Sequence, residues 1–350
     1  MNPFKKIKSY SSFSTNILLS AFNRLKYPYK LTFAITIRCN LKCKTCYVWK
    51  RKPANELSYE EIDRFFKVNG FFNWIDLTGG EIFLRKDLLD ITKSIKRNVK
   101  NLVMLHYPTN GFLTNKIVET TDKIASLDFN NLVLSVSIDG NKDIHNKIRN
   151  NEKAFQNAIA TYKELKKNKH KVYIGCTLSP FNIDHFDNFF MELRDYIPDL
   201  KYSDMHLNVY HYSESLYSNE KLFWDKDKAV DLINDFIKKK GFAFLNPIAL
   251  LESAYLKNVK NYLRSNQSPF KCKSGKISCF MDPVGDVYPC SGYTVAMGNL
   301  RENDYDLLKI ISSKEAASLH EKIKNGKCPH CWTPCEAYQN ILSNLFLRRK

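Results

Sequence analysis

Three cysteines crowd the short segment "TIRCNLKCKTCYVWK". Cys39, Cys43 and Cys46 come directly after the apolar run "LTFAITI", so a loop that leaves a strand would carry all three thiols. A structural zinc ion requires four protein ligands, and no nearby histidine or fourth cysteine completes such a set. Three thiolates instead suit a cubane of four irons with one iron left open. The open iron would be the place where a catalytic site binds its substrate or cofactor.

A second group of cysteines lies in the C-terminal segment. It consists of Cys272, Cys279, Cys290, Cys328, Cys331 and Cys335. "CPHCWTPC" packs three thiols into eight residues, and "DPVGDVYPC" places another at the end of a predicted hairpin. Zinc remains the rival of an iron–sulfur cluster here, because a CxxC pair and a hairpin cysteine can close a tetrahedral site, with His330 among them. The tenth cysteine, Cys176, falls in an apolar run and is expected to be a buried core thiol.

Six short apolar runs, rich in β-branched and aromatic residues, are predicted strands. They cover residues 31–37, 74–78, 101–107, 132–138, 171–179 and 205–212. Segments with helical periodicity separate most of them, and "SYEEIDRFFKV" opens with a capping box formed by Ser58 and Glu61. This alternation predicts an α/β fold built on a parallel sheet. Ligands of such sheets gather at the C-terminal ends of the strands. Four of these ends carry the three thiols, "TGGE", "TNG" and "SIDG".

The CxxxCxxC motif and these strand-end segments together resemble the radical S-adenosylmethionine (SAM) superfamily. The resemblance covers residues 31 to about 212 and implies a partial (β/α)6 barrel. It implies that Cys39, Cys43 and Cys46 ligate a 4Fe–4S cluster whose open iron chelates the amino and carboxylate groups of SAM. By the same resemblance, the cofactor-binding residues are Gly79, Gly80, Glu81, Asn110, Ser137, Asp139 and Arg149. The position before the third cysteine, often aromatic in this family, is Thr45 here, so Tyr47 becomes the candidate for packing against adenine.

The run "FMDPVGDVYPCSGYTVAMGNL" through "CPHCWTPC" resembles the SPASM or twitch extension of radical SAM enzymes, which holds auxiliary iron–sulfur clusters. The terminal group here is CxxCxxxC, shorter than the full SPASM pattern, and no cysteine follows Cys335. We therefore expect one four-cysteine auxiliary cluster, of the 4Fe–4S type, with spare thiols. The preferred ligands are Cys290, Cys328, Cys331 and Cys335, with Cys272 and Cys279 as further candidates.

These patterns predict four parts: an N-terminal basic, amphipathic extension (1–30), a radical SAM core (31–215), a helical bridge (216–267) and an auxiliary-cluster domain (268–350). The resemblance implies an oxidoreductase or maturase that cleaves SAM reductively. The 5′-deoxyadenosyl radical would then abstract hydrogen from a substrate, either a peptide or a small molecule, with the auxiliary cluster assisting. Two other functions fit the cysteine spacing: a zinc-dependent RNA-binding protein, and an iron–sulfur electron-transfer module without SAM chemistry.

The net charge of +18 favours an anionic partner. The lysines are spread along the chain, which disfavours a dedicated nucleic-acid patch. We expect an acidic flavodoxin or ferredoxin to be the electron donor. The N-terminal apolar segment "ILLSAF" is too short to span a bilayer, and no cleavage site follows it. We therefore expect a cytoplasmic protein whose N-terminal helix packs on its body, with peripheral membrane contact as the alternative.

Overall fold

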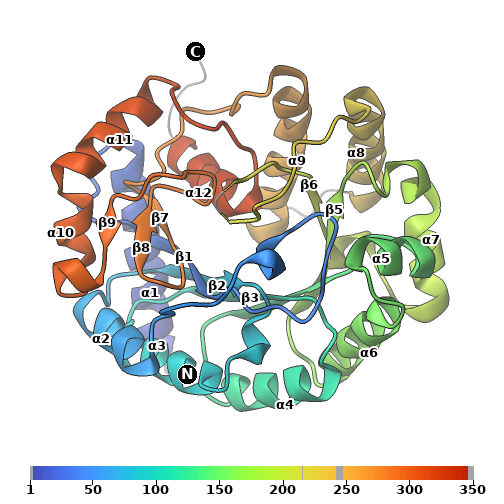
Figure 1. Ribbon diagram of the computed structural model, residues 1–350, viewed down its shortest axis with the longest axis horizontal. Coiled ribbons are helices and arrows are strands. Elements are labelled where there is room, and N and C mark those ends of the chain that lie inside the picture. Colours follow the sequence, from blue (N-terminus) through green and yellow to red (C-terminus); the bar gives the residue numbers. More distant parts are fainter. Residues whose placement is uncertain (1–2, 215, 242–246, 346–350) are drawn as a thin grey trace.

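The computed structural model describes residues 3–214, 216–241 and 247–345 (Figure 1). Each of the six predicted strands is confirmed, and all six run parallel in the order β6-β5-β4-β3-β2-β1. Their bounds are β1 Lys30–Thr36, β2 Trp74–Gly79, β3 Met104–Thr109, β4 Leu132–Ser137, β5 Val172–Leu178 and β6 Met205–Val209. The sheet is open at the β6 edge within the described residues, as in the partial barrel that was predicted.

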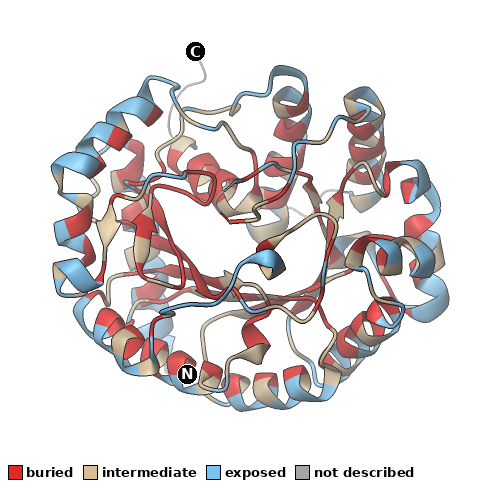
Figure 2. Ribbon diagram, in the orientation of Figure 1, coloured by how far each residue is buried: buried red, intermediate tan, exposed pale blue. Residues whose placement is uncertain are grey.

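Helices cover the outer face of this sheet (Figure 1). They are α2 Tyr59–Val68, α3 Leu88–Asn98, α4 Thr114–Ala125, α5 Lys142–Arg149, α6 Ala154–Lys167 and α7 Phe186–Tyr196. The predicted capping box is present at α2, where the Ser58 side chain accepts from the Glu61 amide and the Glu61 carboxylate accepts from the Ser58 amide. Figure 2 shows the buried sides of these helices turned toward the strands and their exposed sides toward solvent.

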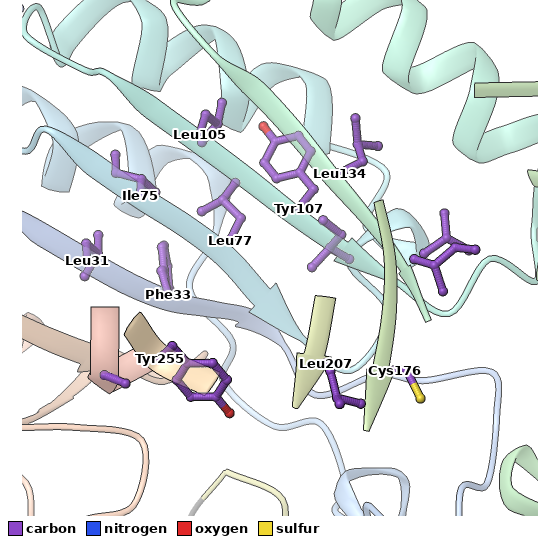
Figure 3. Close-up of a cluster of buried hydrophobic side chains, with 14 of the residues drawn as sticks. Leu31, Phe33, Ile75, Leu77, Leu105, Tyr107, Leu134, Cys176, Leu207 and Tyr255 are labelled. Atoms are coloured by element: carbon purple, nitrogen blue, oxygen red, sulfur yellow. The ribbon is translucent and has the colours of Figure 1, made fainter. Parts of the chain in front are cut away.

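The main core lies between the sheet and these helices. Alternate residues of each strand, such as Leu31 and Phe33 of β1, are fully buried there with Leu77 and Tyr107 from the neighbouring strands (Figure 3). Burying a side chain of this size contributes roughly 1.5–3 kcal/mol. Cys176 of β5 belongs to the same core and is fully buried, so its prediction as a core thiol is confirmed.

The C-terminal segment extends the same sheet on the other side of β1. Strand β7 (Ser278–Met281) pairs parallel with β1, and β8 (Asp286–Tyr288) and β9 (Gly298–Asn299) follow antiparallel, giving a nine-stranded sheet. The predicted hairpin at "DPVGDVYPC" is therefore confirmed as β7–β8. The remaining helices are α1 Pro3–Ala21, α8 Lys226–Lys240, α9 Pro247–Ser265, α10 Leu307–Ile311, α11 Lys314–Lys324 and α12 Pro334–Asn344.

The inner face of the barrel is polar near the start of β1. Lys30 is fully buried there, and its Nζ lies 3.1 Å from an Asp76 carboxylate oxygen and donates to the Cys335 carbonyl oxygen at 2.6 Å and to Gln339 Oε1 at 3.2 Å. Cys335 and Gln339 belong to α12, so this helix is fastened into the barrel through the lysine. A buried charge needs such partners to offset its desolvation.

Candidate functional site

The three-thiol loop lies where β1 ends, at the predicted place. Cys39, Cys43 and Cys46 share one buried cluster with Leu41 and Ala154, and their thiols interact electrostatically with one another. Burial raises the pKa of Cys39 to about 11 and that of Cys46 to about 12. Within the described ranges, no three His, Cys, Asp or Glu side chains are already arranged around a single metal ion. The fit to a larger cluster therefore rests on the donor set, which is three thiols in one largely buried cluster.

The "TGGE" turn fits against this loop through its backbone. Gly80 donates its amide to the Thr36 carbonyl at 2.8 Å, and Glu81 donates its amide to the Arg38 carbonyl at 2.8 Å. A Cβ atom on Gly79 would lie 2.1 Å from the Thr36 carbonyl oxygen, and one on Gly80 would lie 2.1 Å from that of Arg38. Gly79 also has a φ of +138°. Only glycine lets the two strand ends approach this closely.

The Glu81 carboxylate is fully buried and bridges the ends of β2 and β3. It accepts from the Thr109 hydroxyl at 3.0 Å and from the Asn110 amide at 2.8 Å. Burial raises its pKa to about 7, against the opposing effect of these hydrogen bonds. The Asn110 side chain continues toward the thiols, since its Nδ2 donates to Asn40 Oδ1 at 2.8 Å and lies 3.9 Å from Cys39 Sγ. These contacts join the second and third strand ends to the thiol loop.

Arg149 brings the fourth strand end to the same loop. Its Nη1 donates to Cys43 Sγ at 3.8 Å, and its Nε donates to Asp139 Oδ2 at 2.8 Å. The second oxygen of Asp139 accepts from the Thr177 amide at 3.1 Å, so this carboxylate is engaged within the protein. Ser137 is the last residue of β4. The structure thus places a buried cation beside the thiols, and the direct contacts of Ser137, Asp139 and Arg149 with SAM stay predictions.

Tyr47 lies at the rim of the thiol loop. Its amide donates to the Tyr217 carbonyl at 2.8 Å, and its ring faces the Lys50 ammonium with 3.9 Å between Nζ and the ring centroid. Trp49 packs edge-on against the same ring. These contacts hold Tyr47 beside the loop, and its contact with adenine stays a prediction.

A cavity of about 470 Å³ opens where the ends of β1 and β2 meet the β7–β8 hairpin. Its walls include Ala34, Gly79, Arg51, Glu214, Asp282 and Tyr288. Burial raises the pKa of Asp282 to about 6, near the range where a carboxyl can exchange protons at neutral pH. Sequence reasoning found only Gly79 among these residues. The others come from segments far apart in the chain, and no local motif marks them.

The C-terminal thiols lie in three environments. The thiols of Cys272, Cys290, Cys328 and Cys331 interact electrostatically as one group. Cys279 lies in β7, opposite Leu31 of β1, where it is buried in the core. The largest electrostatic neighbours of the Cys335 thiol are Lys30, Asp76 and Glu336. Three of the preferred ligands are therefore brought together with Cys272, while Cys335 lies on α12, closer to the barrel interior.

Glu336 was missed by sequence reasoning, although it lies among these thiols. It is buried, its Oε2 accepts from the Ser274 hydroxyl at 2.8 Å, and its Oε1 accepts from the Ser291 amide at 3.3 Å. The Ser274 hydroxyl is also 3.3 Å from Cys272 Sγ. The carboxylate therefore ties together the two loops that carry Cys272 and Cys290. A single glutamate at the start of an amphipathic helix gives no signal of such a role.

Two family models match this chain. Residues 33–193 match the radical SAM superfamily, and residues 272–332 match the SPASM iron–sulfur cluster-binding domain. These domains imply a 4Fe–4S cluster with SAM in the first case and auxiliary iron–sulfur clusters in the second. The second match begins at Cys272 and ends directly after Cys331, so it spans the four grouped thiols.

Similar proteins include the "antilisterial bacteriocin subtilosin biosynthesis protein AlbA" of Bacillus subtilis, which is 24% identical over 89% of this chain and 68% of its own length. The "AdoMet-dependent heme synthase" of Methanosarcina barkeri is 25% identical over 87% of this chain and 88% of its own length. Among solved structures, Streptococcus suis SuiB bound to SAM has a TM-score of 0.62 at 15% identity, covering 87% of this chain and 70% of SuiB.

The matched domains, the thiol loop at the end of β1 and the parallel sheet agree with one another. The chain is an enzyme of the radical SAM superfamily with a C-terminal SPASM-type iron–sulfur domain.

Proposed function

We propose that this enzyme matures a peptide, by abstracting hydrogen from a residue that enters the cavity between the ends of β1 and β2 and the β7–β8 hairpin, beside the thiol loop. The cavity carries the proposal. Its volume of about 470 Å³ suits a side chain with its flanking backbone, and its walls carry charges of both signs from Arg51, Glu214 and Asp282. The names of two similar proteins point the same way: AlbA is a bacteriocin biosynthesis protein, and SuiB was solved with precursor peptide SuiA.

In this proposal the chain positions the reacting groups. When bound, the 4Fe–4S cluster and SAM supply reductive carbon–sulfur cleavage and removal of a substrate hydrogen atom. Cys39, Cys43 and Cys46 would hold the cluster, and the Gly79–Gly80 turn with Glu81 would bind the amino group of SAM. Arg149 offsets negative charge beside Cys43. The contacts of Lys30 with α12 fasten this helix to the start of β1, at the end of the strand away from the thiol loop.

The function test is an anaerobic incubation of the reconstituted enzyme with SAM, a strong reductant and short peptides encoded beside its gene. We expect a peptide product lighter by two hydrogen atoms, together with 5′-deoxyadenosine above the rate without peptide. The deoxyadenosyl radical would take one hydrogen atom, and the second would leave as a proton while its electron passes to the auxiliary cluster. A deuterated peptide should pass its label to the deoxyadenosine. If a porphyrin raises deoxyadenosine formation and no peptide does, the substrate is a tetrapyrrole and the peptide proposal is wrong.

The electron donor in the cell is proposed to be an acidic flavodoxin or ferredoxin. The net charge of +18 supports this, since long-range attraction speeds the encounter of oppositely charged proteins. We expect flavodoxin-driven SAM cleavage to slow as salt rises, because salt screens charges beyond about 10 Å at 0.1 M. Cleavage driven by dithionite provides the control. Equal salt dependence with both reductants would contradict the proposal.

The grouping of the C-terminal thiols makes a prediction about the auxiliary cluster. We propose Cys272, Cys290, Cys328 and Cys331 as its ligands, because their thiols share one environment. The Cys290→Ala variant should lose about four irons per chain and the electron paramagnetic resonance signal of the auxiliary cluster. The Cys335→Ala variant also removes one thiol from this domain, and it should keep both the iron and the signal. Loss of the signal in Cys335→Ala would instead restore Cys335 as a ligand.

The raised pKa of Glu81 predicts pH-dependent SAM binding. A carboxyl with a pKa of about 7 is largely protonated at pH 6 and ionised at pH 8, and only the ionised form attracts the ammonium of SAM. Affinity should therefore rise with pH through about 7. Glu81→Gln should bind about tenfold more weakly at pH 8 and about equally at pH 6, as measured by calorimetry. The titration of SAM itself affects the wild type and Glu81→Gln alike, so it does not alter their comparison. An equal loss of SAM affinity at all pH values would mean that Glu81 only stabilises the loop.

A further inference from the structure

The N-terminal helix α1 packs on the protein with a side that includes several polar residues, and it leaves several large apolar residues outside. Ser9, Asn16 and Ser20 are 2%, 5% and 1% exposed. They are spaced seven and four residues apart, so they form one stripe along the helix. Phe13, whose ring contacts the buried Tyr29, and Ala21 also lie against the body, so α1 buries a mixed side and leaves further large apolar residues outside.

The outward side of α1 carries large apolar residues. Ile7 and Leu18 are 66% and 45% exposed, and Phe22, directly after the last residue of α1, is 58% exposed. They stand eleven and four residues apart, about three helical turns and one further turn, so they lie in line. Phe4, one turn before Ile7, is 80% exposed. We call Ile7, Leu18 and Phe22 the apolar stripe.

Specific polar contacts hold α1 in this orientation. Asn16 Nδ2 donates to Asn73 Oδ1 at 2.7 Å in a buried contact, and Asn73 Nδ2 donates to the Ser12 hydroxyl at 3.2 Å. At the other end, the Lys273 ammonium donates to the Ser20 carbonyl at 2.8 Å, where a cation also favours the helix C-terminus. The apolar stripe is thus presented outward by contacts that fix the rotation of the helix about its axis.

The helix lies at the end of the barrel opposite to the thiol loop. Asn73 directly precedes β2, and Asn131, whose Nδ2 donates to the Tyr10 hydroxyl at 2.8 Å, directly precedes β4. Both mark the N-terminal ends of strands, whereas the thiols follow the C-terminal end of β1. In Figure 1, α1 lies behind the sheet, on the far side from the loop that follows β1. A surface bound by α1 would leave the cavity open.

The positive charge of the N-terminal segment indicates an anionic partner for the apolar stripe. Residues 1–55 contain twelve Lys and Arg and no Asp or Glu, and Lys5, Lys6 and Lys8 lie in the first turns of α1 itself. An apolar stripe with exposed lysines near its N-terminal end suits the headgroup region of an anionic membrane, where apolar burial and attraction to acidic lipids add together. A second copy of the chain would instead bring these lysines against one another, which costs binding energy.

We propose that the apolar stripe and Lys5, Lys6 and Lys8 dock this enzyme onto an anionic lipid surface, with its cavity facing away from the bilayer. No helix in the described parts of the chain is long and apolar enough to cross a membrane. The contact is therefore peripheral and reversible. It does not depend on the peptide proposal, because it involves the opposite end of the barrel.

Flotation of the reconstituted enzyme with lipid vesicles tests this proposal. Vesicles with about 30% phosphatidylserine, which are anionic, should carry the wild type. Pure phosphatidylcholine vesicles should carry about tenfold less. Substituting Ile7, Leu18 and Phe22 together with serine should lower binding to the anionic vesicles by about tenfold or more. The matched control, with exposed Met191 and Phe223 changed to serine, should bind like the wild type.

The lysines provide an independent variant. Lys5→Glu, Lys6→Glu and Lys8→Glu together should abolish the preference for anionic vesicles, whereas the same change at Lys314, Lys322 and Lys324 of α11 should have little effect. All variants should keep the wild-type iron content, which excludes misfolding. Equal binding of wild type and stripe variant would overturn the proposal. So would a dimer, measured by light scattering, that dissociates in the stripe variant without any vesicle binding.

Discussion

The Cys43→Ser variant will fold and keep its auxiliary cluster but will form no 5′-deoxyadenosine from SAM above background. Cys43 is the most buried of the three loop thiols and contacts Arg149, so serine removes one of only three ligands and leaves no spare donor. Iron per chain should fall by about four. The measurements are iron and sulfide content, and chromatographic assay of deoxyadenosine under strong reductant, where we expect a loss of at least about 1,000-fold.

Cys176→Ala is the control for this experiment. Cys176 is at least as deeply buried as Cys43, but it belongs to the main core and not to the cluster that contains the three loop thiols. Its replacement should lower stability moderately and leave iron content and SAM cleavage unchanged. Retained SAM cleavage in Cys43→Ser would mean that another group ligates the cluster, and the three-thiol assignment would then be wrong.

Gly80→Ala is expected to be strongly damaging although it adds only one methyl group. The added Cβ would lie 2.1 Å from the Arg38 carbonyl oxygen. Backbone hydrogen bonds hold both Gly80 and this carbonyl in place. One strand end must therefore move, which should cost about 3 kcal/mol or more of unfolding free energy and displace the thiol loop. The readouts are the midpoint of denaturant unfolding and the iron content after reconstitution.

Gly175→Ala is a matched change on the inner side of β5. There the added Cβ would meet Ser135 Cβ at 3.7 Å, which is ordinary van der Waals contact. We expect its stability to differ from wild type by less than about 1 kcal/mol and its cluster to assemble normally. If Gly80→Ala behaved in the same way, the close approach of the two strand ends would not govern the site.

Local sequence patterns predicted the barrel well because each element carries its own signal. The six strands follow from short apolar runs, and α2 follows from its capping box. The thiol loop and the glycine turns could be placed at one end of the sheet because parallel strands share a direction. Cys176 was correctly separated from the ligands by its position in an apolar strand.

What the sequence did not predict depends on contacts between distant segments. The pairing of β7 with β1 places Cys279 in the core and joins the auxiliary domain to the barrel sheet. The buried Lys30 finds its partners on β2 and α12, more than forty and three hundred residues away. An amphipathic pattern in α1 shows that the helix has two faces, but which face is buried depends on Asn73 and Lys273, which the pattern does not contain.

The hydrogen bonds between the glycine turn and the end of β1 join the turn rigidly to the start of the thiol loop. Gly80 and Glu81 bond to the carbonyls of Thr36 and Arg38, the latter directly before Cys39. A cysteine motif grafted onto another parallel sheet would lack this support unless the neighbouring strand ended in the same pair of glycines. Relatives that exchange loops during evolution would therefore have to inherit the two segments together, although forty residues separate them in the chain.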